Sequence, residues 1–278
     1  MGRFDLIRLR LGIAGTQQPQ STGTDKLDRH PITRLRHETR QRRLTVASIE
    51  QLTPRMLRFD FTCPDFGDFV SASPDDHVKL FFPDPNAAEG AKPPMRDFTP
   101  RTFDVAAGTI EIDFALHEAG PATSWAAAAR VGDLLEIGGP RGSVVVADDF
   151  DWYLLIGDET ALPAIGRRVE QLRAGARVAT FVTVDHDDEA QSFDTPADWV
   201  PNWIIRDGAT DDAVLLRAVL DQHELPAGDG FVWIAAEASV AREVRSYMLD
   251  VRNHPRAWVK AAGYWKRGEG DAHEKIED

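Results

Sequence analysis

The pattern of apolar residues changes near residue 150, and this change limits the possible folds more than any other feature. Apolar and polar residues alternate over residues 57–61, 78–82 and 110–116, which is typical of half-buried antiparallel strands. Continuous apolar runs follow at 152–156 and 178–184, with a helical pattern between them. Buried strands that alternate with helices predict a parallel sheet covered by helices. The chain is therefore predicted to hold two domains of different class.

The first domain is expected over residues 43–150. Its strands are short and are separated by turn-rich segments at 73–76 and 83–86, which favours an antiparallel barrel. One helix should interrupt the strands, because Gly120 and Pro121 lead into an alanine-rich stretch. Proline is well tolerated in a first helical turn.

The second domain is expected over residues 151–278, and a chain of 278 residues comfortably forms two domains of ordinary size. The pattern predicts strands at 152–156, 178–184, 203–205, 231–236 and 258–261, and helices near 161–172, 213–222 and 240–251.

The chain is acidic overall but basic at its start. It carries 32 Lys or Arg and 45 Asp or Glu, a net charge of −13, which disfavours binding to nucleic acid or anionic lipid. Residues 1–43 nevertheless contain ten Lys or Arg against four Asp or Glu. Residues 1–42 also have little apolar periodicity, so we expect them to form a flexible basic lead.

The sequence gives no sign of a membrane segment, a disulfide or a metal site. It has no run of about 18 apolar residues and no convincing signal peptide, so we expect a cytoplasmic protein without an integral membrane segment. Cys63 is the single cysteine and cannot form an internal disulfide. His186 lies among acidic residues after an apolar strand, a pattern more typical of a hydrated loop than of metal ligands.

Residues 96–101, Arg-Asp-Phe-Thr-Pro-Arg, place a guanidinium, an aromatic ring and a hydroxyl close together at the expected start of a strand. A flavin dinucleotide needs such a set: an arginine for its diphosphate, an aromatic plane for its ring system and a small donor for the ring edge. Arg96 and Phe98 would share one face of a strand. The alternative is an edge strand with ordinary surface arginines.

Residues 117–125, His-Glu-Ala-Gly-Pro-Ala-Thr-Ser-Trp, join a strand end to a helix N-terminus. Free N–H groups and the helix dipole favour a phosphate there, and Gly120 would let the backbone approach it closely. Taken alone, His117 and Trp125 fit a strand-end histidine and a core residue just as well.

Together with Gly-Gly-Pro-Arg-Gly-Ser at 138–143, these two motifs resemble the siderophore-interacting protein family, a branch of the ferredoxin-reductase-like flavoproteins. The resemblance covers residues 43–268 and extends to the segments Asp-His-Val-Lys-Leu at 76–80, Gly-Asp-Glu-Thr-Ala-Leu-Pro-Ala at 157–164 and Gly-Tyr-Trp-Lys-Arg-Gly at 263–268. One departure is Phe98, where the family usually has tyrosine. The resemblance implies a six-stranded antiparallel flavin-binding barrel followed by an α/β parallel-sheet domain of the NAD(P)H-binding kind.

The resemblance also implies an activity, that of an FAD-dependent ferric-siderophore reductase in iron acquisition. The cofactor-binding residues that it implies are Arg96, Asp97, Phe98, Thr99, His117, Gly120, Pro121, Ala122, Ser124 and Thr160. The basic residues implied near the exposed flavin edge, which would receive an anionic ferric siderophore, are Lys79, Arg141, Lys266 and Arg267. Reduced flavin would pass single electrons to Fe(III), and the weaker chelation of Fe(II) would release the metal. Neither a metal ligand nor an acid–base catalytic residue is implied.

The electron donor stays open at this point. The segment from Gly157 to Thr160 follows a strand and opens a helix, as a nucleotide loop should, but Asp158 and Glu159 would repel phosphate unless their side chains turn away. The acidic segment 185–189 would oppose a 2′-phosphate in the same way. Members of the family use NADPH, NADH or a small iron–sulfur protein such as a ferredoxin, and family precedent favours NADPH.

Two other classes of function stay open as well. One is a general flavin-dependent electron-transfer enzyme whose acceptor is not iron. The feature that distinguishes it from a ferric-siderophore reductase is whether Lys79, Arg141 and Lys266 converge beside the flavin. The other is a non-catalytic siderophore-binding protein, against which the intact Arg96–Thr99 set argues.

Overall fold

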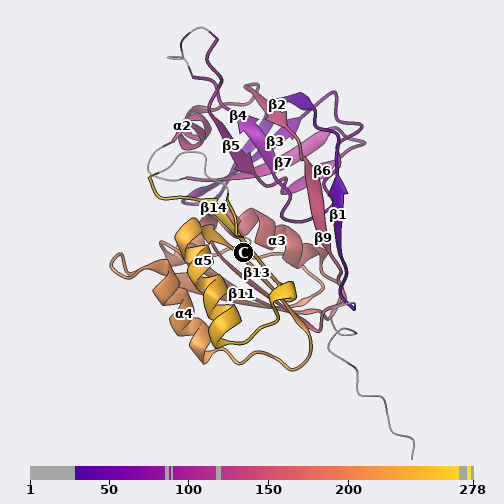
Figure 1. Cartoon of the computed structure of the whole chain (residues 1–278). Helices are drawn as coiled ribbons and strands as arrows, with labels where there is room; N and C mark the ends of the chain where they lie inside the picture. Colours follow the sequence, from indigo (N-terminus) through magenta and orange to yellow (C-terminus); the bar gives the residue numbers. More distant parts are fainter. Residues whose placement is uncertain (1–28, 85–87, 89, 117–119, 269–273, 277–278) are drawn as a thin grey trace, which may run out of the picture.

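The computed structural model describes residues 29–84, 88, 90–116, 120–268 and 274–276 (Figure 1). Strands of the first half of the chain lie at one end of the molecule, and a sheet flanked by helices lies at the other. The two parts meet along α3 (Leu162–Gln171) and β14 (Val259–Trp265).

The first part is built on a seven-stranded antiparallel sheet in the order β5-β4-β8-β2-β3-β7-β6. Its strands are β2 (Gln41–Thr53), β3 (Met56–Thr62), β4 (Val78–Phe81), β5 (Met95–Phe98), β6 (Thr102–Asp104), β7 (Thr109–Ala115) and β8 (Leu134–Gly138). The prediction of six strands is corrected to seven. Among the described residues, no pairing joins the end strands β5 and β6 to close the sheet. A strand as short as β6, with three residues, shows no alternation that a sequence pattern could reveal.

The sheet buries one face in an aromatic-rich core, as its alternating pattern requires. Phe59, Phe61, Ile110, Ile112 and Phe114 are all fully buried there. The helix expected after Gly120 is α2 (Pro121–Ala128), which has proline in its first turn and lays Trp125 against this core.

The expected flexible lead is corrected in part. Residues 1–28 lie outside the described residues, but β1 (Ile32–Arg36) pairs with β9 (Gly142–Val146) in an antiparallel ladder. Just before it, His30 is buried between the carboxylates of Asp149 and Asp229, at 2.7 and 3.3 Å, and stacks on Phe150. A few anchoring contacts therefore order a basic segment that has little apolar pattern.

The second part is the predicted α/β sheet, with five parallel strands in the order β12-β11-β10-β13-β14 and the short antiparallel β15 (Glu274–Lys275) at one edge. The parallel strands are β10 (Trp152–Asp158), β11 (Arg177–Val184), β12 (Asp198–Ile205), β13 (Gly230–Glu237) and β14 (Val259–Trp265). The helices are α3 (Leu162–Gln171), α4 (Asp212–Gln222) and α5 (Ala238–Ser246), and a π-helical turn, Tyr247–Val251, continues α5. Strands β10 and β13 are buried along their whole length, which explains their continuous apolar runs.

Short helical turns complete the chain at Glu159–Ala161, Asp187–Glu189 and Arg256–Trp258. In the part of the chain that the structure describes, no helix is both long enough and apolar enough to cross a membrane.

Candidate active site

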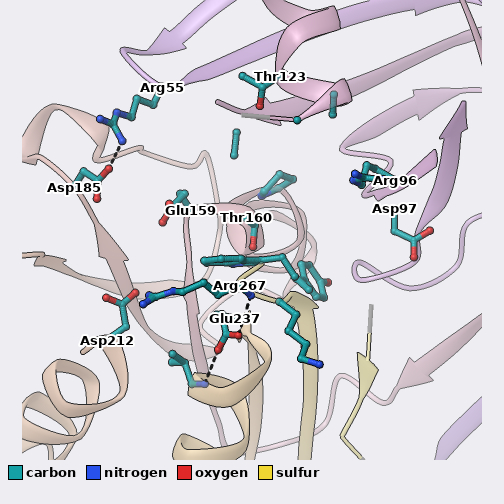
Figure 2. Close-up of a pocket in the computed structure, with 18 of the residues that line it drawn as sticks. Arg55, Arg96, Asp97, Thr123, Glu159, Thr160, Asp185, Asp212, Glu237 and Arg267 are labelled. Atoms are coloured by element: carbon teal, nitrogen blue, oxygen red, sulfur yellow. Dashed lines mark hydrogen bonds and ion pairs between the residues drawn. The ribbon is translucent and has the colours of Figure 1, made fainter. Parts of the chain in front are cut away.

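A cavity of about 970 Å³ opens between the two parts of the molecule (Figure 2). One side is formed by the end of β5 and the start of α2, and the other by residues at the carboxyl ends of the parallel strands. Strands β10 and β13 are neighbours there although they are not consecutive in the chain, so the cavity adjoins the point where the strand order reverses. Open α/β sheets bind their ligands at such a point.

The Arg-Asp-Phe-Thr motif lines this cavity at the end of β5 rather than at the start of a strand. Thr99 follows the strand and is buried. Phe98 packs on Phe114 of the sheet core, with ring centroids 4.4 Å apart, so its ring position is fixed by the core. Arg96 and Asp97 lie beside one another on the same side of the cavity (Figure 2).

The start of α2 also lines the cavity, through Gly120, Pro121, Ala122 and Thr123. Its first turn has neither a side-chain cap nor an acidic residue, which suits an anion, although Pro121 has no N–H and Ser124 donates its N–H to the Gly120 carbonyl oxygen at 2.9 Å. Gly120 has a φ of 150°, a conformation that L-residues with side chains rarely adopt. Thr123, which belongs to the motif but was not among the predicted cofactor-binding residues, also lines the cavity.

One predicted residue of this segment lies elsewhere, and another is not described. Ser124 is exposed and does not belong to the cavity lining. His117 lies outside the described residues.

The nucleotide-type loop turns its first carboxylate away from the cavity. Asp158 is buried and accepts hydrogen bonds from the backbone N–H groups of Thr160 and Glu237, both at 2.9 Å, and from Trp265 Nε1 at 2.8 Å. Burial raises the pKa of Asp158. Thr160 itself lines the cavity.

The second carboxylate of that loop belongs to a charged network that the sequence analysis missed. Arg206, directly after β12, pairs with Glu159 at 2.7 Å and with Asp185 and Asp212 at 2.9 Å. Burial alone would lower the pKa of Arg206, but its hydrogen bonds to Asp212 and Glu159 outweigh this effect and raise the pKa. Arg55, from the turn between β2 and β3, pairs with Asp185 across the cavity (Figure 2).

Glu237 occupies the N-terminus of α5. Its carboxylate accepts hydrogen bonds from the N–H groups of Ser239 at 2.6 Å and Val240 at 3.2 Å, and from that of Arg267 at 3.3 Å. Figure 2 shows Glu237 and Arg267 together on the α/β side of the cavity. The start of α5 is therefore capped by a side chain, whereas the start of α2 is not.

The four predicted basic residues are not all brought together. Lys266 and Arg267 line the cavity. Lys79 on β4 lies opposite Asp97 on β5, and its ammonium pairs with the Asp97 carboxylate at 2.9 Å. Arg141 is exposed and does not contribute to the cavity lining.

Comparison with known proteins agrees with this arrangement. Residues 45–144 match the family model of the siderophore-interacting FAD-binding domain, and residues 150–268 match that of the siderophore-interacting protein. A protein of Escherichia coli (strain K12) named NADPH-dependent ferric-chelate reductase is 34% identical over 250 residues, which are 84% of this chain and 95% of that protein. The chain belongs to the siderophore-interacting protein family.

Other known proteins are similar over most of the chain. The ferric vibriobactin reductase ViuB of Vibrio cholerae is 28% identical over 239 residues, which are 79% of this chain and 87% of that protein. A siderophore utilization protein from T. fusca has 36% identity and a TM-score of 0.80, covering 87% of this chain and 98% of the other. A ferredoxin reductase of carbazole 1,9a-dioxygenase, with 17% identity and a TM-score of 0.60 over 80% of this chain and 68% of its own, shares the fold.

The residues of this siderophore-interacting protein fit an FAD cofactor. The cavity is at the upper end of the range usual for ligand sites, about 300–1,000 Å³, as a dinucleotide requires. An uncapped helix start and Arg96 suit a diphosphate, and Phe98 and Thr99 suit the ring system and its polar edge.

Proposed function

We propose that this protein is an FAD-dependent ferric-siderophore reductase, with NADPH as electron donor. The overall reaction is NADPH + 2 Fe(III) → NADP⁺ + H⁺ + 2 Fe(II), and the weaker chelation of Fe(II) releases the metal. The observation that carries the proposal is the cavity in which the Arg96–Thr99 strand end, the uncapped start of α2 and the basic pair Lys266 and Arg267 meet. The names of the Escherichia coli and Vibrio cholerae relatives support the same reaction.

The flavin, when bound, accepts two electrons as a hydride and passes them on singly. The protein's part is to bind and orient it. In the proposal, Arg96 and the N–H groups at the start of α2 hold the diphosphate, with Gly120, Pro121 and Ala122 close to the cofactor. Phe98 supports the ring system and Thr99 contacts its polar edge. Asp97 is placed beside the ring, and its ion pair with Lys79 holds its carboxylate in position.

The ferric siderophore is placed on the open side of the ring edge, near Lys266 and Arg267. Many Fe(III) complexes with catecholate or hydroxamate ligands are anions, and basic side chains raise their local concentration. Lys79 shares its charge with Asp97, and Arg141 stands outside the cavity. We therefore give Lys266 and Arg267 the main part in substrate binding.

The donor site is placed at the carboxyl ends of β10, β11 and β12, with Thr160 in contact with the nucleotide. Asp158 is turned inward and Glu159 is paired with Arg206, so the loop repels phosphate less than its sequence suggests. Arg55 and Arg206 are among the cations that line the cavity.

The proposal includes the domain organisation and the location. We take residues 43–150 as the FAD domain, with the seven-stranded sheet curled as a flavin-binding barrel, and 151–278 as the nucleotide domain. The matches at 45–144 and 150–268 support this division. We place the reaction in the cytoplasm, where NADPH is available to it.

The test is an anaerobic visible spectrum of the FAD-loaded protein, recorded after NADPH and again after a ferric siderophore, with an Fe(II)-specific chelator present. We expect the flavin absorbance to bleach with NADPH and to recover as the Fe(II) chelate forms. If NADPH fails but dithionite-reduced protein still yields Fe(II), the donor is a partner protein such as a ferredoxin. If the protein does not bind FAD, the proposal is wrong.

A further inference from the structure

The residue after β11 stands where an open α/β sheet contacts the ribose of a dinucleotide. Taken in chain order, the parallel strands lie third, second, first, fourth and fifth across the sheet, which matches the order of dinucleotide-binding domains. In such domains a carboxylate near the end of the second strand accepts a hydrogen bond from the ribose 2′-hydroxyl, or an arginine accommodates a 2′-phosphate. The second strand here is β11, which ends at Val184, so Asp185 has this place, and it lines the cavity.

Asp185 faces two arginines that come from the two parts of the molecule. Arg206, directly after β12, pairs with Asp185 at 2.9 Å, and Arg55, from the turn between β2 and β3, pairs with it through Nη1 (Figure 2). Burial alone would raise the pKa of Asp185, but the hydrogen bond from Arg206 and the charges of both arginines outweigh burial and lower the pKa. Asp185 is therefore ionised at physiological pH, and its charge opposes a phosphate at the 2′ position.

The two arginines differ in how strongly their charge is already shared. Arg206 is 18% exposed and also pairs with Glu159 at 2.7 Å and with Asp212 at 2.9 Å, so three carboxylates surround it. Among the described residues, Arg55 makes its ion pair through one terminal nitrogen, and its side chain is 48% exposed, so a second anion can reach its guanidinium. A guanidinium binds phosphate through two parallel N–H groups. Arg55 is therefore better placed than Arg206 to bind a phosphate.

The turn that carries Arg55 is fixed against the loop that carries Asp185. Thr53 Oγ1 donates to the buried carboxylate of Glu189 at 2.6 Å, and Glu189 ends the helical turn that follows Asp185. The N–H of Leu116 donates to the backbone oxygen of Arg55 at 2.8 Å. The backbone on both sides of the ion pair is therefore held in place, and a ligand at this point meets one side chain from each part of the molecule.

We propose that Arg55 and Asp185 set the preference between NADPH and NADH, with Arg55 binding the 2′-phosphate of NADPH and Asp185 opposing it. The inference deepens the proposed function and rests on it, because it requires a nicotinamide nucleotide at the carboxyl ends of the parallel strands. When NADPH binds, its 2′-phosphate takes the place of Asp185 beside Arg55, and Arg206 retains the Asp185 carboxylate. NADH has no phosphate for Arg55, and its 2′-hydroxyl donates to Asp185.

The experiment measures kcat/KM for NADPH and for NADH in FAD-loaded wild type and variants, with ferricyanide as electron acceptor. The ratio of the two values within one variant does not depend on the fraction of protein that is folded. We expect Arg55→Gln to lower the NADPH/NADH ratio about tenfold, because a charge-assisted hydrogen bond to the phosphate is lost. Arg55→Lys keeps the charge and should lower the ratio only about threefold. Asp185→Asn should raise the ratio about fivefold, because a negative charge beside the phosphate is removed.

The matched control is Arg43→Gln. Arg43 lies on β2 of the same part of the molecule, its ion pair with Glu136 is open to water, and it does not line the cavity. We expect its NADPH/NADH ratio to stay within about twofold of wild type.

A binding measurement provides a readout that does not depend on turnover. Isothermal titration calorimetry compares 2′,5′-ADP, which carries the 2′-phosphate, with 5′-AMP, which lacks it. We expect Arg55→Gln to weaken binding of 2′,5′-ADP about tenfold and to leave binding of 5′-AMP unchanged.

The outcomes separate this inference from the reductase proposal. An NADPH/NADH ratio and a 2′,5′-ADP affinity that are unchanged in Arg55→Gln would overturn the inference and leave the reductase proposal intact. Wild type that neither nucleotide reduces, but that yields Fe(II) after reduction with dithionite, would overturn both the inference and the choice of donor. Failure of the wild type to bind FAD would overturn the reductase proposal itself.

Discussion

Arg101 pairs with Glu170 through both of its terminal nitrogens, at 2.7 Å from Nη1 to Oε2 and 2.5 Å from Nη2 to Oε1. Arg101 ends the flavin motif, and Glu170 lies on α3 of the α/β part. From the same helix, Arg167 donates to the backbone oxygens of Pro100 at 3.0 Å and Ser71 at 2.8 Å. Helix α3, which follows the loop at 157–160, therefore holds the segment 99–101 in place through these hydrogen bonds.

Glu170→Gln should lower the free energy of unfolding by about 2 kcal/mol, because it leaves the guanidinium of Arg101, only 5% exposed, with a weaker partner. Asp113, 3.8 Å from Arg101 Nε, limits the loss. The control is Glu136→Gln, whose ion pair with Arg43 is open to water, with side chains 50% and 68% exposed. It should change stability by less than about 0.5 kcal/mol. Urea unfolding of both variants measures the difference, and equal midpoints would contradict the account.

Asp75 makes the stability of the contact between the two parts of the molecule depend on pH, because its ion-pair partners Lys260 and Arg168 belong to the α/β part. Burial alone would raise the pKa of Asp75, but the charges of Lys260, 2.5 Å away, and Arg168 outweigh it and hold the pKa well below its usual value. A carboxylate whose pKa is lowered by folding stabilises the folded state above its unfolded pKa, about 4, and loses that contribution as the pH falls.

We therefore expect Asp75→Asn to be less stable than wild type at pH 7, and the gap between them to narrow progressively below about pH 4. Urea midpoints across this range measure it. A gap that is constant with pH would show that the Asp75 charge is not involved.

Phe98 should support the flavin through its ring alone. Phe98→Leu is expected to weaken FAD binding about fivefold, since aromatic stacking contributes about 1 kcal/mol beyond area burial. Phe98→Tyr keeps the ring and should bind FAD within about twofold of wild type. Quenching of FAD fluorescence on titration gives both dissociation constants, and equal affinities of the Leu and wild-type proteins would count against the placement of the ring.

The fold was predictable wherever burial leaves a mark on the sequence. The run at 152–156 became the fully buried strand β10, and the run at 178–184 became the largely buried strand β11, because both faces of that sheet are covered. Strand β1 left no such mark, since Ile32 and Leu35 are exposed and the strand is held by pairing with β9. Backbone pairing of this kind has little sequence signal.

The site was predictable as motifs but not as contacts. Arg96, Phe98, Thr99 and Thr160, which the resemblance implied as cofactor-binding residues, all line one cavity. Arg206 could not be found in this way, because its three carboxylate partners come from separate segments of the chain. Ser124 lies outside the cavity because of its position around the axis of α2, and a sequence motif does not specify which face of a helix a residue occupies.

Lys266 should matter more than Arg141 for substrate binding, because Lys266 lines the cavity and Arg141 does not. Lys266→Gln is expected to raise the KM for an anionic ferric siderophore about fivefold at low salt, with a smaller effect at high salt, because screening weakens the attraction. Arg141→Gln should change KM less than twofold. Initial rates at two ionic strengths measure both, and a larger effect at Arg141 would shift the substrate site towards β9.

The most direct test of the central claim is a single turnover without NADPH. FAD-loaded protein is reduced anaerobically with one equivalent of dithionite and mixed with excess ferric siderophore and an Fe(II)-specific chelator. The account predicts full recovery of the flavin absorbance and two Fe(II) per FAD, since the cofactor carries two electrons and Fe(III) accepts one. Flavin that stays reduced, with no Fe(II) formed, would show that ferric iron is not the acceptor.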